Sequence, residues 1–334
     1  MNTALERDGP GLLLRDILRD DPQVAAFANV VAQVSPDILV LQGVDYDHDL
    51  VTLTALRDRI EDADGPRFPY VFAGRPNTGM ATGLDMDGDG ELGRARDKQG
   101  YGRFVGQAGM AILSRYPFDT DGVQDFSALK WRDMPGAILP KTLGAPFPST
   151  VAQTAQRLSS VGHWVVPVVL PGNTFLHLLT FHAGPPVFDG PEDRNGRRNH
   201  DEIRFWHLFL DGAFGPAPQA GFVLLGDANL DPVDGEGRKE AIQNLLADPR
   251  LQDPEPKRSG PAFQGPGQAG DPELDTVAWP QDGPGHLRVQ YILPSVDLDV
   301  MRAGVHWPSP DAPHAGDVDA AGPHRMVWVD LMLP

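Results

Sequence analysis

Polar side chains that could perform acid–base or phosphate chemistry follow several apolar segments of this sequence. In FVLLGDANLDP, residues 222–232, Asp227 and Asn229 follow an apolar run and stand two positions apart. Both side chains of such a pair point to the same side of an extended chain. A carboxylate and an amide placed this way suit a hard cation, or an oriented nucleophile and a phosphate oxygen. Because these residue types also favour turns, a plain turn is the alternative.

Two histidines stand in comparable positions. His182 directly follows the apolar run of LLTFHAGPP, and His324 precedes the apolar segment 326–333. An imidazole can transfer a proton, contact a phosphate or bind a metal, although a single histidine is more often structural. Active sites collect at strand ends, so the three strand ends taken together favour one shared site.

The segment DILVLQGVDYDHD, residues 37–49, also leads from an apolar run into carboxylates. Asp45, Asp47 and Asp49 follow Gly43, which stands at the end of the expected strand and offers no side chain. This pattern is compatible with a metal site, with a metal site that has lost a ligand, or with a polar loop. Asp45 lies two residues after Gly43 and could therefore face the same way.

An acidic loop at residues 83–97 places four carboxylates at alternate positions: Asp85, Asp87, Asp89 and Glu91. They match ligand positions 1, 3, 5 and 7 of an EF-hand-like calcium loop, and Gly90 matches the glycine at position 6. The twelfth position holds Arg96 instead of glutamate, and Asp97 could substitute. The pattern predicts a structural calcium loop, with a solvated acidic loop as the alternative.

The densest basic cluster of the chain lies in VFDGPEDRNGRRNHDE, residues 187–202. It consists of Arg194, Arg197 and Arg198. Guanidinium groups close to a strand end can hold a phosphate bidentately, so these residues are candidates for substrate binding. The equally weighted alternative is a surface loop whose arginines pair with the acids of the same stretch.

The elements that must position these residues are helices and short apolar strands. Apolar spacing predicts helices over residues 22–34, 50–62, 200–214 and 238–248. It predicts strands over residues 37–42, 69–74, 109–118, 163–170, 174–181, 287–295 and 326–333, and a strand from 222 that breaks into a polar loop by 232. Residues 75–103 and 252–285 are predicted loops. This mixture indicates an α/β sandwich, and no change in composition marks a domain boundary, so we expect one domain over 1–334.

Composition narrows the class of protein further. The chain has 334 residues and a formal charge of −18, and such a field disfavours binding of long nucleic acids. It has no cysteine, which excludes disulfides and thiol chemistry. No apolar run approaches the roughly 18 residues of a membrane span. The first residues, MNTALERDGPGLLL, lack the pattern of a secretion signal. We expect a monomer that does not enter a membrane.

Taken together, these motifs resemble the endonuclease/exonuclease/phosphatase superfamily. The stretch HAGPPVFDGPEDRNG is similar to one carried by a bacterial branch. The segments GMAILSRYP, WRDMPGAILP, GDANLDP and HRMVWVDL, which occur in the family's order, reinforce the resemblance. The resemblance covers nearly the whole chain. It implies a four-layer α/β sandwich, in which two packed mixed β-sheets are flanked by helices and the site lies at one end. It also implies an extracytoplasmic location in bacteria.

The resemblance implies metal-assisted hydrolysis of a phosphoester, with magnesium or manganese as the cofactor. The expected substrate is a phosphorylated small molecule or a phosphodiester. His182 matches the histidine that contacts the phosphate, and Asp227 with Asn229 matches the pair that orients water and phosphate. His324 matches the terminal histidine, which is a general base or phosphate ligand. Asn2 matches the asparagine that ends the family's first strand, and that strand is missing here.

This sequence departs from the family pattern at its acids. Gly43 replaces the glutamate that is the main metal ligand, Gln290 and Pro323 replace aspartates, and Val165 also replaces an acid. Losing groups that orient metal ligands typically costs roughly 10–100-fold in affinity or activity. One hypothesis is a weakened phosphoesterase in which Asp45 or Asp227 binds the metal together with Asn2. The other is a catalytically degenerate relative that acts as a binding or structural module.

Overall fold

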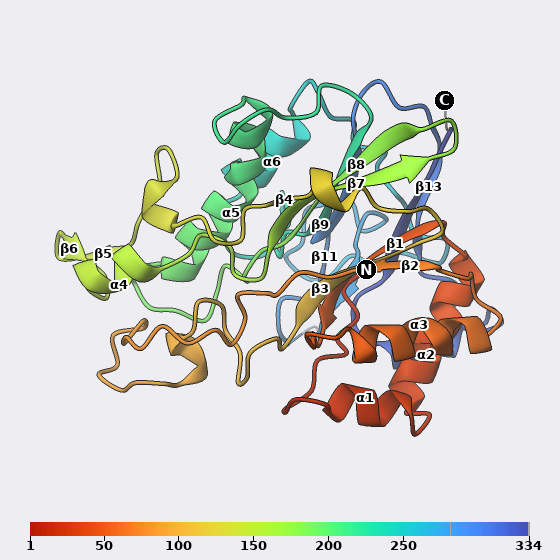
Figure 1. Ribbon diagram of the computed structural model, residues 1–334, viewed down its shortest axis with the longest axis horizontal. Coiled ribbons are helices and arrows are strands. Elements are labelled where there is room, and N and C mark those ends of the chain that lie inside the picture. Colours follow the sequence, from red (N-terminus) through yellow and green to blue (C-terminus); the bar gives the residue numbers. More distant parts are fainter. Residues whose placement is uncertain (281, 333–334) are drawn as a thin grey trace.

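The computed structural model describes residues 1–280 and 282–332 (Figure 1). Two β-sheet layers pack face to face, and helices cover the outer side of each layer. The predicted four-layer α/β sandwich is therefore confirmed. In Figure 1 the helices α1–α3, red to orange, lie on one side of the strands, and α5 and α6, green to cyan, lie on the other.

The first layer is a five-stranded mixed sheet. Its strands, in spatial order, are β12 (Gln290–Pro294), β9 (Phe222–Asp227), β8 (Thr174–His182), β7 (His163–Leu170) and β4 (Gln124–Asp125). Only β8 and β9 are parallel neighbours. The helix α5 (Arg194–Leu210) connects them, as a parallel pair requires. The predicted hairpin of β7 and β8 is present.

The second layer contains two separate groups of strands. One is a three-stranded sheet in the order β1 (Ile38–Val44), β3 (Gly109–Ser114) and β2 (Tyr70–Phe72). The other is the antiparallel pair β13 (Val300–His306) and β14 (Met326–Leu331). The helices α1 (Leu12–Ile17), α2 (Pro22–Val34), α3 (Val51–Asp62) and α7 (Ala315–Ala321) cover this layer.

The alternation of side chains along β1 explains how the layers hold together. Leu39 and Leu41 pack against the helices, whereas Val40 points the other way and packs against the five-stranded sheet. On the opposite layer, Val166 and Leu178 meet Val40 between the two sheets. Burying an aliphatic side chain in this way stabilises the fold by about 1.5–3 kcal/mol. The apolar run of β1 thus places Gly43, next to the end of this strand, close to the five-stranded sheet.

Several elements differ from the sequence-based expectation. The helix α5 begins at Arg194, six residues before the predicted start. Its first turns were missed because they carry polar residues and show no apolar periodicity, although Gly196, Arg198 and Asn199 are buried. Strand β13 and helix α7 were not predicted, since the short segments MRAGVH and AGDVDAA carry little apolar periodicity. The helix α6 spans only Glu240–Leu246.

Short elements also lie outside the predictions. They are α4 (Thr150–Ala155), β5 (Lys141–Thr142), β6 (Ala145–Pro146), β10 (Val277–Ala278), β11 (His286–Leu287) and the 3-10 turns η1 (Ala95–Asp97), η2 (Thr120–Gly122) and η3 (Trp131–Asp133). Two of these, η1 and β10, lie inside segments predicted as loops. Among the described residues, no helix has the length and apolar character needed to cross a membrane.

Candidate active site

Three adjacent strands of the mixed sheet bring the first site residues together. His182 at the end of β8 is in register with Asp227 at the end of β9, and Asp227 is in register with Gln290 on β12. Because β8 and β9 are parallel, their carboxyl ends meet at the same edge of the sheet. Asp227 is fully buried there. The strand ends identified from the sequence therefore converge on one place.

Asp227 lies at the centre of the site. Its Oδ2 accepts a hydrogen bond of 2.9 Å from the Asn2 side chain, which arrives from the second layer through the parallel bridge of Asn2 with Gln42. The same oxygen lies 3.9 Å from His182 Nε2 and 3.8 Å from His324 Nδ1. One carboxylate thus faces two imidazoles and an amide that come from three distant parts of the chain.

Both histidines are buried and favour the neutral form. Burial lowers the pKa of His182, while the carboxylates of Asp227 and Glu6 oppose the shift. Burial likewise lowers the pKa of His324 to about 4. The Nδ1 atoms of both rings have no hydrogen-bond partner among the described residues. Each ring therefore keeps one buried nitrogen without a hydrogen-bond partner among the described residues.

Asn229 fixes the loop after β9. Its backbone N–H donates to Asp227 Oδ1 at 2.9 Å, and its side-chain amide donates to the Ala183 carbonyl at 2.8 Å. Its φ of +49° is a conformation that asparagine tolerates better than most residues. The side chain therefore joins the ends of β8 and β9 and orients the Asp227 carboxylate.

Sequence reasoning missed a second residue that joins these strand ends. Asn199 of α5 is completely buried, and its amide donates to the carbonyls of Gly184 at 2.8 Å and Ala228 at 2.7 Å. Glu202, one turn later, accepts from Gly184 N–H at 2.8 Å. The signal available in the sequence was that Asn199 and Glu202 are polar residues on the apolar face of α5. Both hold the turns beside His182 and Asp227.

Gly43 sits where no side chain can be added without conflict. It forms a bulge in β1 with φ +70°, and a Cβ there would lie 2.4 Å from Asn2 Oδ1. Its carbonyl accepts from Leu5 N–H and Thr3 Oγ1. The space beside Gly43 is thus filled by residues 2–5. Oriented to satisfy its neighbours, the Gln290 amide donates to the Arg325 carbonyl and accepts from Asn2 N–H.

The structure gives Asp45 a different role from the predicted metal ligand. Its two carboxylate oxygens accept from the backbone N–H groups of Ala108 and Arg7, each at 3.0 Å. Burial raises the pKa of Asp45 to about 6. Asp47 binds the first amides of α3, those of Val51 and Thr52, at 2.8 Å. Of the readings open for this segment, an ordered polar loop fits the geometry best.

The predicted arginine cluster is used inside the protein. Arg198 is buried and donates to the carbonyls of four residues: Leu158, Gln99, Arg157 and Ser159. Arg194 donates to the Met86 carbonyl, and Arg197 donates to the Glu192 carbonyl. These contacts through Nε and Nη2 give Arg198 a structural role, and substrate binding by the three arginines stays a prediction. Arg194 also ties α5 to the acidic loop.

The acidic loop is compact. Ligand atoms of Asp85, Asp87 and Asp89 lie within 4.8 Å of one another. Asp97 turns inward and accepts from the N–H groups of Met86 and Arg94. Glu91 pairs with the Arg94 side chain, so it does not join the three aspartates. Calcium binding by this loop stays a prediction.

Few metal-ligating side chains surround Asp227. Within residues 1–280 and 282–332, three His, Asp or Glu side chains present ligand atoms within 4.8 Å of one another only in the acidic loop. Magnesium is usually held through one or two carboxylates, and here Asp227 also accepts from Asn2 and Asn229. Glu6, an exposed acid close enough to His182 to oppose its pKa shift, is the other carboxylate of this region.

The sandwich and the strand-end site define an endonuclease/exonuclease/phosphatase-like protein. A family model described as "Endonuclease/Exonuclease/phosphatase family" matches residues 5–322. The chain therefore belongs to this family. A comparison with curated proteins finds no match.

Solved structures share this fold at low sequence identity. An endonuclease/exonuclease/phosphatase from Beutenbergia cavernae is 18% identical with a TM-score of 0.55, over 99% of this chain and 69% of that one. A family protein from Leptotrichia buccalis is 14% identical with a TM-score of 0.52, over 93% of both chains. Beta toxin from Staphylococcus aureus is 12% identical with a TM-score of 0.52, over 99% and 97%.

Proposed function

We propose that this protein is a phosphoester hydrolase that acts as a monomer on small phosphomonoesters or phosphodiesters. The observation that supports the proposal is the position of Asp227 between His182 and His324, at 3.9 and 3.8 Å from its Oδ2. The family membership supports the same reaction class. The net charge of −18 favours small substrates over long nucleic acids.

The residues suggest a division of roles. His182 and His324, which burial keeps neutral, would donate hydrogen bonds to phosphate oxygens and stabilise the charge that develops there. Asp227 would accept a proton from the attacking water. Asn229 and Asn2 hold the two oxygens of that carboxylate, so its orientation is fixed before the substrate binds.

The resemblance also implies a metal cofactor. Because Asp227 belongs to no cluster of three His, Asp or Glu ligands in the described residues, we derive no step through a metal. A phosphoesterase that depends on Asp227 and two imidazoles alone would be slow, since the charge of a cation contributes several kcal/mol in such reactions. We expect low turnover and a small effect of chelators.

A specific observation favours the second candidate, a module that binds phosphate without hydrolysing it. Gln290 occupies the place of a family aspartate and makes two backbone hydrogen bonds that need no charge. Gly43 has its neighbouring space filled by Asn2. Neither position therefore needs an acidic side chain to satisfy its neighbours.

Hydrolysis of p-nitrophenyl phosphate and bis(p-nitrophenyl) phosphate tests the proposal. We expect measurable release of p-nitrophenol that Asp227→Asn lowers by at least about 100-fold, a cost consistent with loss of a general base. Asp62→Asn, at an exposed position of α3, is the matched control and should leave the rate unchanged. Parallel assays with Mg²⁺, Mn²⁺ and EDTA measure metal dependence. Inactivity in every condition, with phosphate still raising the melting temperature, would favour the binding module.

A further inference from the structure

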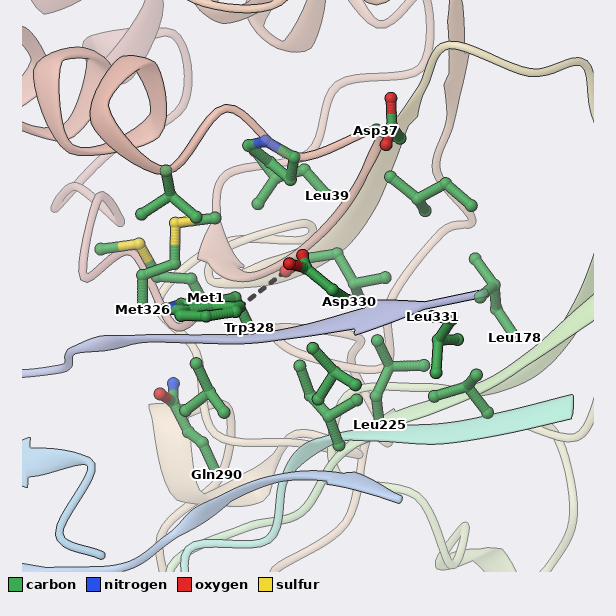
Figure 2. A pocket seen from close by; sticks show the side chains of 18 of the residues that line it. Met1, Asp37, Leu39, Leu178, Leu225, Gln290, Met326, Trp328, Asp330 and Leu331 are labelled. Atoms are coloured by element: carbon green, nitrogen blue, oxygen red, sulfur yellow. Dashed lines mark hydrogen bonds between the residues drawn. The ribbon is translucent and has the colours of Figure 1, made fainter. Parts of the chain in front are cut away.

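Side chains of β8 and β9 alternate between the two faces of the five-stranded sheet. Leu178 and Leu225 point towards β1 and β14, where they line an apolar cleft (Figure 2). Phe181 points the other way and packs with α5. His182 and Asp227 follow Leu178 and Leu225 by four and two residues, so their side chains belong to the face of the second layer. Helix α5 covers the opposite face, and its contacts with these strand ends go to the backbone.

Glu202 of α5 holds the turn that follows His182. Its carboxylate is completely buried, and Oε2 accepts a hydrogen bond of 2.8 Å from Gly184 N–H while Oε1 accepts from Ser160 N–H. The Gly184 carbonyl is held as well, by the Asn199 side chain at 2.8 Å. One helix therefore fixes both polar backbone groups of Gly184, two residues beyond His182.

The approach of α5 to this turn leaves no room at Gly184. A Cβ there would lie 2.7 Å from Ser160 Oγ and 3.7 Å from Glu202 Oε2. Gly184 is absent from the residues with positive φ, so close packing rather than backbone conformation requires a glycine. The Gly184 backbone thus has one packed position against the helix, and a change at Glu202 is transmitted to the end of β8.

The ionised form of Glu202 is the one that fits this arrangement. Both carboxylate oxygens accept from backbone N–H groups, and a proton on either oxygen would put a donor where an acceptor is needed. Burial raises the pKa of Glu202 to about 7, although the Arg198 guanidinium and the two N–H groups favour the charged form. His163 of β7 lies 2.9 Å from the Glu202 carbonyl oxygen and is neutral, so it adds no charge.

We propose that Glu202 is a positioning residue for His182 and that full activity requires its ionised form. The inference rests on the proposed phosphoester hydrolysis. Above pH 7 the carboxylate holds Gly184 and keeps His182 in place beside Asp227. Below pH 7 the carboxyl group gains a proton, one N–H group loses its acceptor, and the end of β8 is held less firmly. Turnover then falls on acidification through a group that does not touch the substrate.

The pH dependence of kcat in the wild type and in Glu202→Gln tests the proposal, with bis(p-nitrophenyl) phosphate as substrate. Glutamine keeps the shape of the side chain but offers one acceptor oxygen at every pH. At pH 8.5 we expect Glu202→Gln to lower kcat by roughly 10–100-fold and to change KM by less than about twofold. At pH 6 the difference in kcat should be roughly 5–10-fold smaller, because only about a tenth of the wild type is then ionised.

Profiles of the same shape for both proteins, or a loss in KM alone, would overturn the proposal. Asp45 and Asp275, whose pKa values burial raises to about 6 and about 7, are present in both proteins, so the difference between the profiles reports Glu202. Glu236→Gln, at an exposed position, is the matched control and should follow the wild type.

Amide hydrogen exchange of the unaltered protein separates this inference from the proposed function. After correction for the intrinsic effect of pH, protection of the Gly184 amide should fall by at least about fivefold between pH 8 and pH 6, whereas the Thr180 amide within β8 should keep its protection. Constant protection at Gly184 contradicts the inference even if hydrolysis is observed. If no hydrolysis occurs at any pH, the proposed function fails, and a fall in protection at Gly184 still shows that Glu202 holds the end of β8. This measurement needs no variant, so misfolding of Glu202→Gln cannot hide the answer.

Discussion

At the scale of single residues, the contact between Gly43 and Asn2 decides what the site can hold. Gly43 combines a φ of +70° with a position where a Cβ would lie 2.4 Å from Asn2 Oδ1. Asn2 in turn donates to Asp227. A side chain at position 43 would therefore displace the residue that holds the central carboxylate. Gly43→Glu alone is therefore expected to damage the site.

Two glycine substitutions separate the cost of backbone strain at position 43 from the cost of the collision with Asn2. Gly11→Ala places a Cβ at φ +75° with no heavy atom within 4 Å, so it should cost about 1 kcal/mol from backbone strain alone. Gly43→Ala should cost about 1–3 kcal/mol more, because the methyl group also collides with Asn2. Urea unfolding of both variants measures the difference. Equal losses would show that Asn2 moves aside freely.

At the scale of elements, the packing of α5 against β7 buries a histidine that stays neutral. His163 Nε2 lies 2.9 Å from the Glu202 carbonyl oxygen, and its Nδ1 lies 2.9 Å from Ser159 Oγ. Burial lowers the pKa of His163 to about 4. The neutral ring can satisfy both neighbours, by donating to the carbonyl and accepting from the hydroxyl. A second ring proton, on Nδ1, would end the hydrogen bond that the Ser159 hydroxyl donates.

This histidine makes the fold sensitive to acid. Above pH 6.5 His163 is neutral in both states; as the pH falls towards 4, only the unfolded chain gains the proton, so stability falls by up to roughly 3 kcal/mol. His163→Gln removes this loss, and its stability relative to the wild type should rise by that amount between pH 7.5 and 4. Denaturant unfolding across this range provides the measurement. Glu202, whose pKa burial raises to about 7, is present in both proteins. A constant stability difference would contradict the prediction.

The acidic loop gives a second prediction at this scale. Because Asp85, Asp87 and Asp89 present oxygens close together, millimolar Ca²⁺ should raise the melting temperature by a few degrees. Asp87→Asn should remove this effect, while Asp62→Asn should keep it. Differential scanning calorimetry with Ca²⁺, Mg²⁺ and EDTA distinguishes a selective site from general screening of charge. No shift with Ca²⁺ would leave the loop as a solvated acidic turn.

The helices and strands show how much of the fold and of the candidate site the sequence predicts. Apolar periodicity located β1, β7, β8, β9 and the ends that carry His182 and Asp227, because strand burial is encoded locally. It could not locate Asn199, whose two acceptors belong to the turns after β8 and β9, or the burial of Arg198. The role of Asp45 also depends on amides from other segments. Such roles arise only when the segments pack together.

At the scale of the whole molecule, the charge of −18 governs which substrates can approach. It repels polyanions over about one Debye length, roughly 10 Å at 0.1 M salt. For proteins with basic binding surfaces, added salt weakens nucleic-acid binding. For this chain added salt is expected to strengthen nucleic-acid binding, because salt screens the repulsion between two negative charges.

Salt dependence tests this expectation directly. Raising NaCl from 50 to 300 mM should increase kcat/KM for a duplex oligonucleotide by several-fold, if any hydrolysis is detected. The same change should alter kcat/KM for the singly charged bis(p-nitrophenyl) phosphate by less than about twofold. The ratio of the two values corrects for effects of salt on the fold. A fall in the oligonucleotide rate would reveal a local basic surface that overrides the net charge.

The hydrogen bond from Asn2 to Asp227 joins residues that are 225 positions apart, and His324 lies a further 97 positions along the chain. During synthesis on a ribosome, the amide emerges before the carboxylate, and the second imidazole emerges after both. A growing chain therefore cannot assemble this constellation until His324 has left the ribosome. Termination before residue 324 yields chains that lack the complete site.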